Sequence, residues 1–265
     1  MDFVSVSFAR NADDINEARN LLRAAGGKGH IVAKIERAEA VENIFEIIEA
    51  SDVIMVARGD LAVEIGYAAM TGLQKNLIRQ TRAQNKIAIT ATQMLESMIT
   101  NPSPTRAEVS DVANAVMDGT DAVMLSAETA VGKFPAQAVQ TMSELCIGAE
   151  KHEIFRGPRN SRLEDVFTYV DEAIALAAMY TANHLQVSAI IAFTESGATS
   201  LWMSRVRSDI PIYAFTRHEA TRRRVALYRG VYPESFDVVH AEPGRIYQSA
   251  IEVLEKVGAV RSGDL

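Results

Sequence analysis

The residues with the clearest chemical potential in this sequence are charged side chains at the ends of short apolar runs. Lys34 and Glu36 lie two positions apart near the end of HIVAKIE (30–36). Residues two apart in a strand project to the same side. A lysine beside a carboxylate can hold a phosphoryl oxygen and a divalent cation together. The alternative for this pair alone is a salt bridge at the end of a strand.

A second charged group follows the next apolar run, VIMVA (53–57). Arg58, Gly59 and Asp60 come directly after it. Gly59 would let the backbone approach a ligand closely, and Asp60 offers a hard oxygen ligand of the kind that magnesium prefers. A plain turn from strand to loop would also explain the tripeptide. Glu36 and Asp60 together, at the ends of neighbouring strands, predict a shared magnesium site.

Hydroxyls and one further carboxylate end two later apolar runs. Thr92 ends KIAITAT (86–92), and Ser126 and Glu128 lie in LSAET (125–129). Side chains of these types can carry a proton to a reacting carbon, as general acid catalysis requires. For Thr92 or Ser126 taken alone, a turn or helix-cap hydroxyl is the alternative.

The elements that would position these residues alternate along the first 150 positions. Apolar runs predict strands at 3–8, 30–36, 52–57, 86–92 and 121–126. Apolar residues at helical spacing predict helices at 13–25, 38–50, 69–84 and 106–118. Thr105, followed three positions later by Glu108, has the form of a capping box that begins the last of these helices. This order is typical of a parallel sheet or barrel covered by helices, whose chemistry gathers at one edge.

A domain boundary is expected at 151–165, where KHEIFRGPRNSRLED mixes charge, Gly and Pro without apolar periodicity. We therefore predict a partial (β/α) barrel over 1–150, a linker over 151–165 and a smaller α/β domain over 166–265. Within the last region we expect helices at 166–185, 199–207, 218–229 and 244–257, and strands at 187–193 and 210–215.

Composition narrows the class of protein. The chain has 265 residues, of which 48% are hydrophobic, and a formal net charge of -7. This length suits one large domain or a large and a small one, and the interspersed charges argue against a nucleic-acid surface. Cys146 is the only cysteine, so no intrachain disulfide can form. Without a recognisable leader or a membrane-length apolar run, we expect a cytoplasmic protein that does not bind membranes.

Five stretches together resemble the pyruvate kinase family, in its bacterial form. They are VAKIERAEAVENI (32–44), IMVARGDLAVEI (54–65), ITATQMLESM (89–98), NPSPTRAEVSDVANAVMDGTDAVMLSAET (101–129) and DEAIALAAMYTANHL (171–185). The resemblance implies a TIM (β/α)8 barrel, of which these strands correspond to the last five, followed by most of the family's C-terminal α/β domain. It also implies phosphoryl transfer from phosphoenolpyruvate to ADP in glycolysis, giving pyruvate and ATP, with Mg²⁺ (or Mn²⁺) and K⁺.

The resemblance assigns a role to each residue of the two charged groups. Lys34 would steady the phosphoryl group during transfer, and Glu36 and Asp60 would bind the catalytic magnesium. The backbone at Gly59 and Asp60 would bind the substrate carboxylate, and Arg58 would also be a substrate-binding residue.

The hydroxyls of the later strands also receive roles. Thr92 would lie beside the bound substrate. Thr92, Ser126 and Glu128 would relay a proton to the enolate that remains after phosphoryl transfer.

The loop TESGAT in the C-terminal part joins a predicted strand to a predicted helix. Its backbone amides, hydroxyls and helix N-terminus could hold phosphate, and the family uses this loop for phosphorylated allosteric effectors. The residues concerned are Thr194, Ser196, Gly197 and Thr199. The alternative is a strand-to-helix turn with capping hydroxyls.

The resemblance further implies a homotetramer and a longer complete enzyme. Complete members have eight barrel strands and a lid domain, so we expect this chain to be a fragment that is inactive alone. Ala62 stands where the family commonly has glycine. Two other functions stay open: a non-catalytic effector-binding or subunit-interaction fragment, and another phosphoenolpyruvate/pyruvate barrel enzyme, such as an aldolase or lyase.

Overall fold

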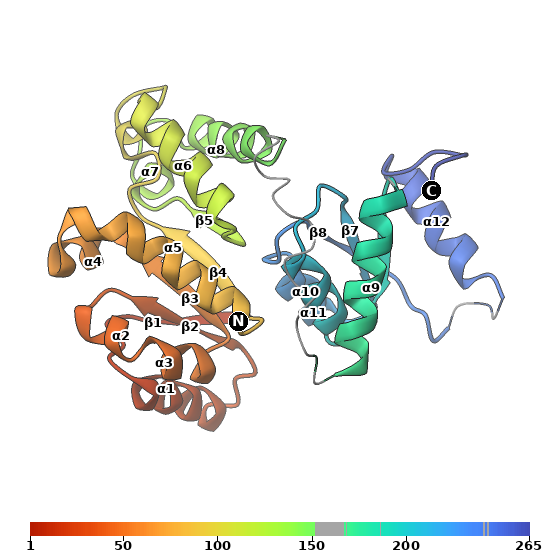
Figure 1. Ribbon diagram of the computed structural model, residues 1–265, viewed down its shortest axis with the longest axis horizontal. Coiled ribbons are helices and arrows are strands. Elements are labelled where there is room, and N and C mark those ends of the chain that lie inside the picture. Colours follow the sequence, from red (N-terminus) through yellow and green to blue (C-terminus); the bar gives the residue numbers. More distant parts are fainter. Residues whose placement is uncertain (152–166, 168, 186, 241, 243) are drawn as a thin grey trace. The chain divides into compact units, whose positions relative to one another are not determined.

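The computed structural model describes residues 1–151, 167, 169–185, 187–240, 242 and 244–265. The chain divides into two compact units, Met1–His152 and Glu153–Leu265. In the described residues each unit has its own parallel sheet with helices around it (Figure 1). The predicted linker over 151–165 lies, except for its first residue, outside the described residues.

The sheet of the first unit has five described strands that pair in the order of the chain. All the pairs are parallel, so the carboxyl ends of the strands share one edge. Every residue of the third and fourth strands is buried, as in a sheet covered on both faces. The strands are β1 (Phe3–Val6), β2 (His30–Ile35), β3 (Val53–Ala57), β4 (Ile87–Ala91) and β5 (Ala122–Met124).

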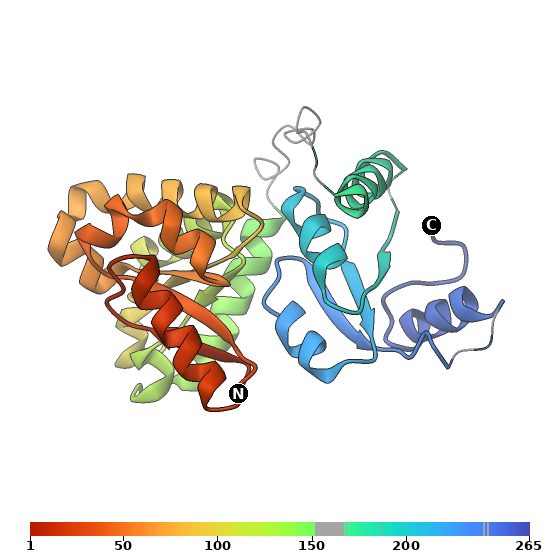
Figure 2. The ribbon, with the colours of Figure 1, turned by 90° about the horizontal axis from the view of Figure 1, so that it is seen from below.

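Helices follow the strands and pack against one another in the same order. The helices are α1 (Ala12–Ala24), α2 (Ala38–Glu42), α3 (Ile44–Ala50), α4 (Arg58–Ile65), α5 (Tyr67–Ala83), α6 (Arg106–Asp118), α7 (Ala127–Ala130) and α8 (Pro135–Glu150), with a 3₁₀ turn, η1, at Glu96–Ile99. Contacts run from α1 to α3, from α3 to α5, from α5 to α6 and from α6 to α8. Figure 2 shows these helices along the sheet of the first unit.

The main core of the first unit lies between the sheet and these helices. Ile31, Ile35 and Ile54 from the strands meet Ile47 and Leu77 from the helices, and all five are fully buried. Burial of an isoleucine or leucine side chain contributes about 1.5–3 kcal/mol. The apolar runs that predict the strands therefore also supply the core that holds them.

The helix expected over 38–50 is wrong as a single element. It is split into α2 and α3 at Asn43, whose φ of -97° and ψ of 16° interrupt the helix. After the break Phe45 lies on the outside with 67% of its surface exposed, although its spacing from Ile44 and Ile48 suggests a buried face.

Three described helices of the first unit have no counterpart in the sequence-based expectation. Helix α4 begins at Arg58, directly after β3, where a turn was one alternative. Helix α7 is a short helix after β5. Helix α8 buries Ala138, Met142 and Ala149, two of which are alanines, so the sequence shows no clear apolar stripe. Pro135 at its first turn is a recognised helix-start signal that indicates α8 in retrospect.

The second unit has three described strands, which pair in the order β6, β7, β8 and are all parallel. They are β6 (Ile190–Phe193), β7 (Ile212–Thr216) and β8 (Val231–Ser235), with helices α9 (Val170–Leu185), α10 (Ala198–Arg205), α11 (Glu219–Val225) and α12 (Ile246–Lys256). Strand β8 was not expected, because Pro233 lies in its middle. Proline is tolerated here because β8 is an edge strand of this sheet.

No helix in the described part of either unit is long and apolar enough to span a lipid bilayer.

Candidate functional site

Lys34 and Glu36 meet at the carboxyl end of β2. Lys34 Nζ lies 2.5 Å from Glu36 Oε1, and it donates a hydrogen bond of 3.1 Å to Ser7 Oγ. The Glu36 side chain is only 1% exposed, and its Oε2 accepts a 2.7 Å hydrogen bond from the Phe8 N–H. A buried carboxylate needs such partners. The segment after β1 thus holds Glu36 in place, while the Lys34 side chain stays 25% exposed.

Asp60 and Gly59 lie in the first turn of α4, after the next strand. Asp60 is exposed, and among the described residues its carboxylate makes no hydrogen bond or ion pair. The Gly59 N–H donates a 2.9 Å hydrogen bond to Thr92 Oγ1. A Cβ at position 59 would meet Thr92 at an ordinary contact distance of 3.6 Å. The described chain itself therefore does not require glycine here.

Thr92 directly follows β4 in a backbone conformation that is rare for a β-branched residue. Its φ is 69°, and that of Gln93 is 54°. The Thr92 hydroxyl donates a 2.6 Å hydrogen bond to the Ala91 carbonyl and accepts the one from Gly59. The ends of β3 and β4 are therefore joined through this hydroxyl.

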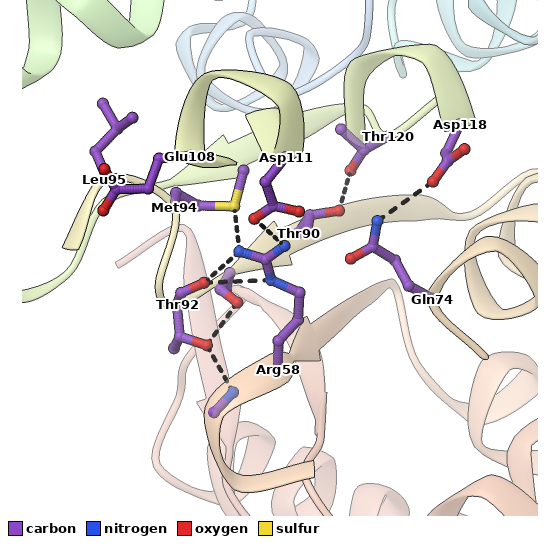
Figure 3. A network of polar contacts seen from close by, with 12 residues as sticks. Arg58, Gln74, Thr90, Thr92, Met94, Leu95, Glu108, Asp111, Asp118 and Thr120 are labelled. Atoms are coloured by element: carbon purple, nitrogen blue, oxygen red, sulfur yellow. Dashed lines mark hydrogen bonds and ion pairs between the residues drawn. The ribbon is translucent and has the colours of Figure 1, made fainter. Parts of the chain in front are cut away.

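The Arg58 guanidinium lies beside Thr92 and α6 (Figure 3). Arg58 Nη1 contacts Asp111 Oδ2 at 2.6 Å. Arg58 Nη2 and Nε donate to the Thr92 carbonyl oxygen at 2.7 and 3.3 Å, and Nη2 also lies 2.9 Å from Met94 Sδ. Arg58 thus connects three segments that are distant in the sequence.

Glu128 and Ser126 lie after β5. Glu128 is 2% exposed and accepts hydrogen bonds from the Ser126 N–H at 2.7 Å and the Leu95 N–H at 3.1 Å. Its carboxylate therefore ties the start of α7 to the segment after β4. Ser126 is half-buried, and in the described chain no hydrogen bond joins Thr92 to Ser126 or Glu128.

Glu36 and Asp60 are the residues that could hold a divalent cation at this edge. No group of three or more His, Cys, Asp or Glu side chains in the described residues could enclose a metal ion. Magnesium commonly binds through one or two carboxylates, with waters and substrate phosphates completing its shell. The two side chains are therefore of the chemical type that binds magnesium.

The predicted effector loop of the second unit lies between β6 and α10. Thr194 Oγ1 accepts a 2.8 Å hydrogen bond from the Gly197 N–H, and Gly197 has a left-handed backbone with φ of 83°. Ser196 is exposed and Thr199 half-buried. The Thr194 hydroxyl is thus used in the turn itself.

An acidic side chain lies within this loop. Glu195 contacts His218 Nε2 and lies 3.4 Å from Arg217 Nη2. The hydrogen bond from His218 lowers the pKa of Glu195 below its ordinary value. A phosphate at this loop would therefore meet the Glu195 carboxylate beside His218 and Arg217.

Sequence reasoning missed Ser7, Phe8 and Asp111. Ser7 lies near the end of the first predicted strand, at the same edge as Lys34, which is a usable signal. Asp111 lies three positions after Glu108 on α6, so the two carboxylates share a side of that helix. Nothing in the sequence indicates the N–H of Phe8, because its direction depends on a left-handed φ of 54°.

These features define a (β/α) barrel protein with a lysine, two carboxylates and a hydroxyl at the carboxyl edge of its strands. Residues 1–139 match the family described as "Pyruvate kinase, barrel domain", and residues 172–265 match "Pyruvate kinase, alpha/beta domain". The chain belongs to the pyruvate kinase family, and the predicted fold class is confirmed.

Individual relatives agree with this assignment. Over the whole of this chain, "Pyruvate kinase II" of Salmonella typhimurium is 55% identical and the pyruvate kinase of Haemophilus influenzae 50% identical. A crystal structure of a pyruvate kinase from Cryptosporidium parvum matches the whole chain with a TM-score of 0.93 at 37% identity. In each case the match covers 56% of the relative, so the chain spans about half the length of these proteins.

Proposed function

We propose that the first unit carries the site of a pyruvate kinase, which moves the phosphoryl group of phosphoenolpyruvate to ADP. The observation that carries this proposal is the contact of Lys34 Nζ with the buried Glu36 carboxylate at the strand edge, 2.5 Å apart. Phosphoryl transfer needs mainly positioning and neutralisation of charge. The bond between phosphorus and the enol oxygen breaks, and a terminal ADP oxygen forms the new bond to phosphorus.

Lys34 supplies the positive charge for the phosphoryl group in transfer. Its side chain is held by Glu36 and Ser7 but is 25% exposed, so its ammonium can face a ligand. Glu36 and Asp60 would hold Mg²⁺ (or Mn²⁺), which supplies charge neutralisation at the phosphate oxygens. Asp60 has no competing partner among the described residues.

The first turn of α4 is the proposed binding site of the substrate carboxylate. The first N–H groups of a helix have no partner within it, and they favour anions. Gly59 and Asp60 lie in this first turn. The Gly59 N–H is taken by Thr92, and a glycine leaves the approach to the remaining N–H groups open. Thr92 would lie beside the carboxylate, because its hydroxyl bonds to the Gly59 N–H.

The enolate left after transfer takes up one proton at carbon to give pyruvate. We assign this step to Thr92, which follows β4, and to Ser126 and Glu128, which follow β5. The support is that Glu128 is buried and holds the backbone of both Ser126 and Leu95 in place. A water molecule would have to complete the path, because no direct hydrogen bond joins these side chains in the described chain.

We also propose the family's remaining properties for the complete protein. These are a K⁺ requirement, a cytoplasmic location, a homotetrameric assembly and a phosphorylated effector at Thr194, Ser196, Gly197 and Thr199. Their support is family membership and, for the effector, the turn at Gly197 followed by the start of α10.

The test is release of pyruvate from phosphoenolpyruvate and ADP, with Mg²⁺ and K⁺, by the purified chain and two variants. Lys34→Ala should lower kcat by about 100- to 1,000-fold, as loss of a charge-stabilising donor does. Lys75→Ala is the matched control, because Lys75 pairs with Asp118 away from the strand edge. It should keep the parental rate. Full activity of Lys34→Ala would contradict the proposal. A folded parental chain without turnover would show that the site needs the rest of a complete enzyme, as expected for a fragment.

A further inference from the structure

We infer that Arg58 is a positioning residue for this site, which acts through Thr92 on the start of α4 and so on Asp60. This inference rests on the proposed function, in which Asp60 holds the metal ion. It gives Arg58 a role within the protein rather than a direct contact with substrate.

The guanidinium of Arg58 is committed to protein atoms. Its side chain is 8% exposed, and its nitrogens contact Asp111 Oδ2 at 2.6 Å and the Thr92 carbonyl oxygen at 2.7 and 3.3 Å (Figure 3). A guanidinium presents its N–H groups in a rigid plane, so contacts to two partners fix its orientation. The ion pair with Asp111 on α6 thereby holds the Arg58 side chain that donates hydrogen bonds to Thr92.

The backbone conformation of Thr92 has to be held by its surroundings. A threonine with φ of 69° is strained, and conformations of this kind persist only where the surroundings enforce them. Hydrogen bonds from a charged donor are stronger than those between neutral groups. The two bonds from Arg58 to the Thr92 carbonyl oxygen therefore serve to hold this conformation.

The held Thr92 caps α4 from another segment of the chain. Ala57, which precedes the helix, has no side chain that could accept a hydrogen bond from its first turn. Thr92 Oγ1 instead accepts the Gly59 N–H at 2.9 Å. Asp60 is the next residue, so the position of its carboxylate follows from this cap.

The test is amide hydrogen exchange of Gly59, measured by NMR in the full chain. Arg58→Lys keeps the charge, but a lysine lacks the planar guanidinium that donates to both Asp111 and the Thr92 carbonyl oxygen. We expect Gly59 to exchange about tenfold faster, as the loss of a local hydrogen bond permits. Thr92→Ala removes the acceptor and should have the same effect. The double variant should be no faster than Thr92→Ala alone.

Arg19→Lys is the matched control. Arg19 also spans a carboxylate and a carbonyl, with Nη1 2.9 Å from Asp52 Oδ2 and Nη2 2.7 Å from the Ala50 oxygen, at the other end of β3. It should leave Gly59 exchange unchanged.

Asp111→Asn is the second variant if Arg58→Lys does not fold. It weakens the same contact to Arg58 and should also accelerate hydrogen exchange at the Gly59 amide. The inference would be overturned if Gly59 exchange is unchanged in a folded Arg58→Lys or Asp111→Asn variant. It would also be overturned if the effects of Arg58→Lys and Thr92→Ala multiply in the double variant.

A kinetic readout separates this role from general stability. Arg58→Lys should raise the Mg²⁺ concentration for half-maximal turnover by about 10- to 100-fold, because loss of a residue that orients a metal ligand changes metal affinity on this scale. In the double variant, the increase in this Mg²⁺ concentration should not be the product of the increases caused by Arg58→Lys and Thr92→Ala. Increases that multiply would contradict the inference. A parental chain without turnover would show that the site needs the rest of a complete enzyme, and Gly59 exchange would still decide whether Arg58 holds Thr92.

Discussion

At the scale of single residues, the strand edge combines strained backbone with functional contacts. Phe8 has a φ of 54° and donates its N–H to Glu36, and Thr92 has a φ of 69° and accepts from Gly59. Strain of this kind gathers at functional sites because it is retained only where it positions something. Substitutions at these residues should therefore affect stability and activity by different amounts.

Thr92→Gly tests that separation. Glycine adopts a left-handed backbone without strain, so the variant regains part of the 1–3 kcal/mol that the threonine costs, while it loses a hydrogen bond of about 1 kcal/mol. We expect the free energy of unfolding to change by less than about 1 kcal/mol, and pyruvate release to fall by at least about tenfold, as for loss of a positioned hydroxyl.

Gln93→Gly is the control, because Gln93 is exposed and also has a positive φ, of 54°. It should gain stability in urea unfolding and keep the parental rate. A Thr92→Gly variant with full activity would show that the hydroxyl is dispensable.

Residue types at strand ends could be predicted from the sequence, and their partners could not. Lys34 and Glu36 face each other because residues two apart on a strand share a side, which is a local rule. Arg58 turns toward Asp111, which lies 53 positions further along the chain. That choice depends on how α6 packs, so no spacing rule reveals it. The split at Asn43 and the alanine-lined helix α8 were missed for the same reason, since packing decides both.

At the scale of elements, Glu108 joins α6 to η1. The predicted capping box is confirmed: Thr105 Oγ1 accepts from the Glu108 N–H, and the Glu108 carboxylate accepts from the Thr105 N–H. The same carboxylate accepts 2.7 and 2.6 Å hydrogen bonds from the N–H and hydroxyl of Ser97. Burial raises the pKa of Glu108, but the hydrogen bonds from Ser97 and Thr105 outweigh it and leave the pKa below its ordinary value.

Glu108→Ala should consequently cost more than loss of an ordinary helix cap. Thr105→Ala removes a capping hydroxyl and should cost about 1 kcal/mol. Glu108→Ala removes charge-assisted hydrogen bonds to two segments and should cost about 2–3 kcal/mol. Urea unfolding of both variants measures the difference. Equal losses would mean that the link to Ser97 contributes nothing.

At the scale of the whole molecule, the two units have separate sheets and separate cores. The core of the second unit is built around Phe215, Ala250 and Leu254, and Trp202, the only tryptophan, lies in that unit. Fluorescence therefore reports on the second unit alone, whereas far-ultraviolet circular dichroism reports on both.

Asp52 makes the first unit sensitive to acid. Burial raises the pKa of Asp52, but hydrogen bonds from His30, the Ile31 N–H and Arg19 outweigh it and hold the pKa well below its ordinary range. A carboxyl group with a depressed folded pKa stabilises fully above its unfolded pKa of about 3.9. That stabilisation is lost as the pH falls through the folded value.

We therefore expect Asp52→Asn to weaken the first unit at pH 7 and to flatten its loss of stability below about pH 4. Urea unfolding between about pH 3 and pH 7 should show this in the dichroism and not in Trp202 fluorescence. Asp13→Asn, which removes an exposed carboxylate from the same unit, should change neither. An equal shift of the fluorescence midpoint by Asp52→Asn would show that the units unfold as one.

The pairing of β1 to β5 in chain order has a consequence for synthesis on the ribosome. Each strand pairs with the strand that was made before it, so each step closes only the one helical connection between neighbouring strands. The sheet can grow strand by strand while the chain is still being translated. The newest strand is always the open edge until its successor covers it, and open edges can pair with other chains. The speed of translation therefore sets how long each edge is exposed to neighbouring nascent chains.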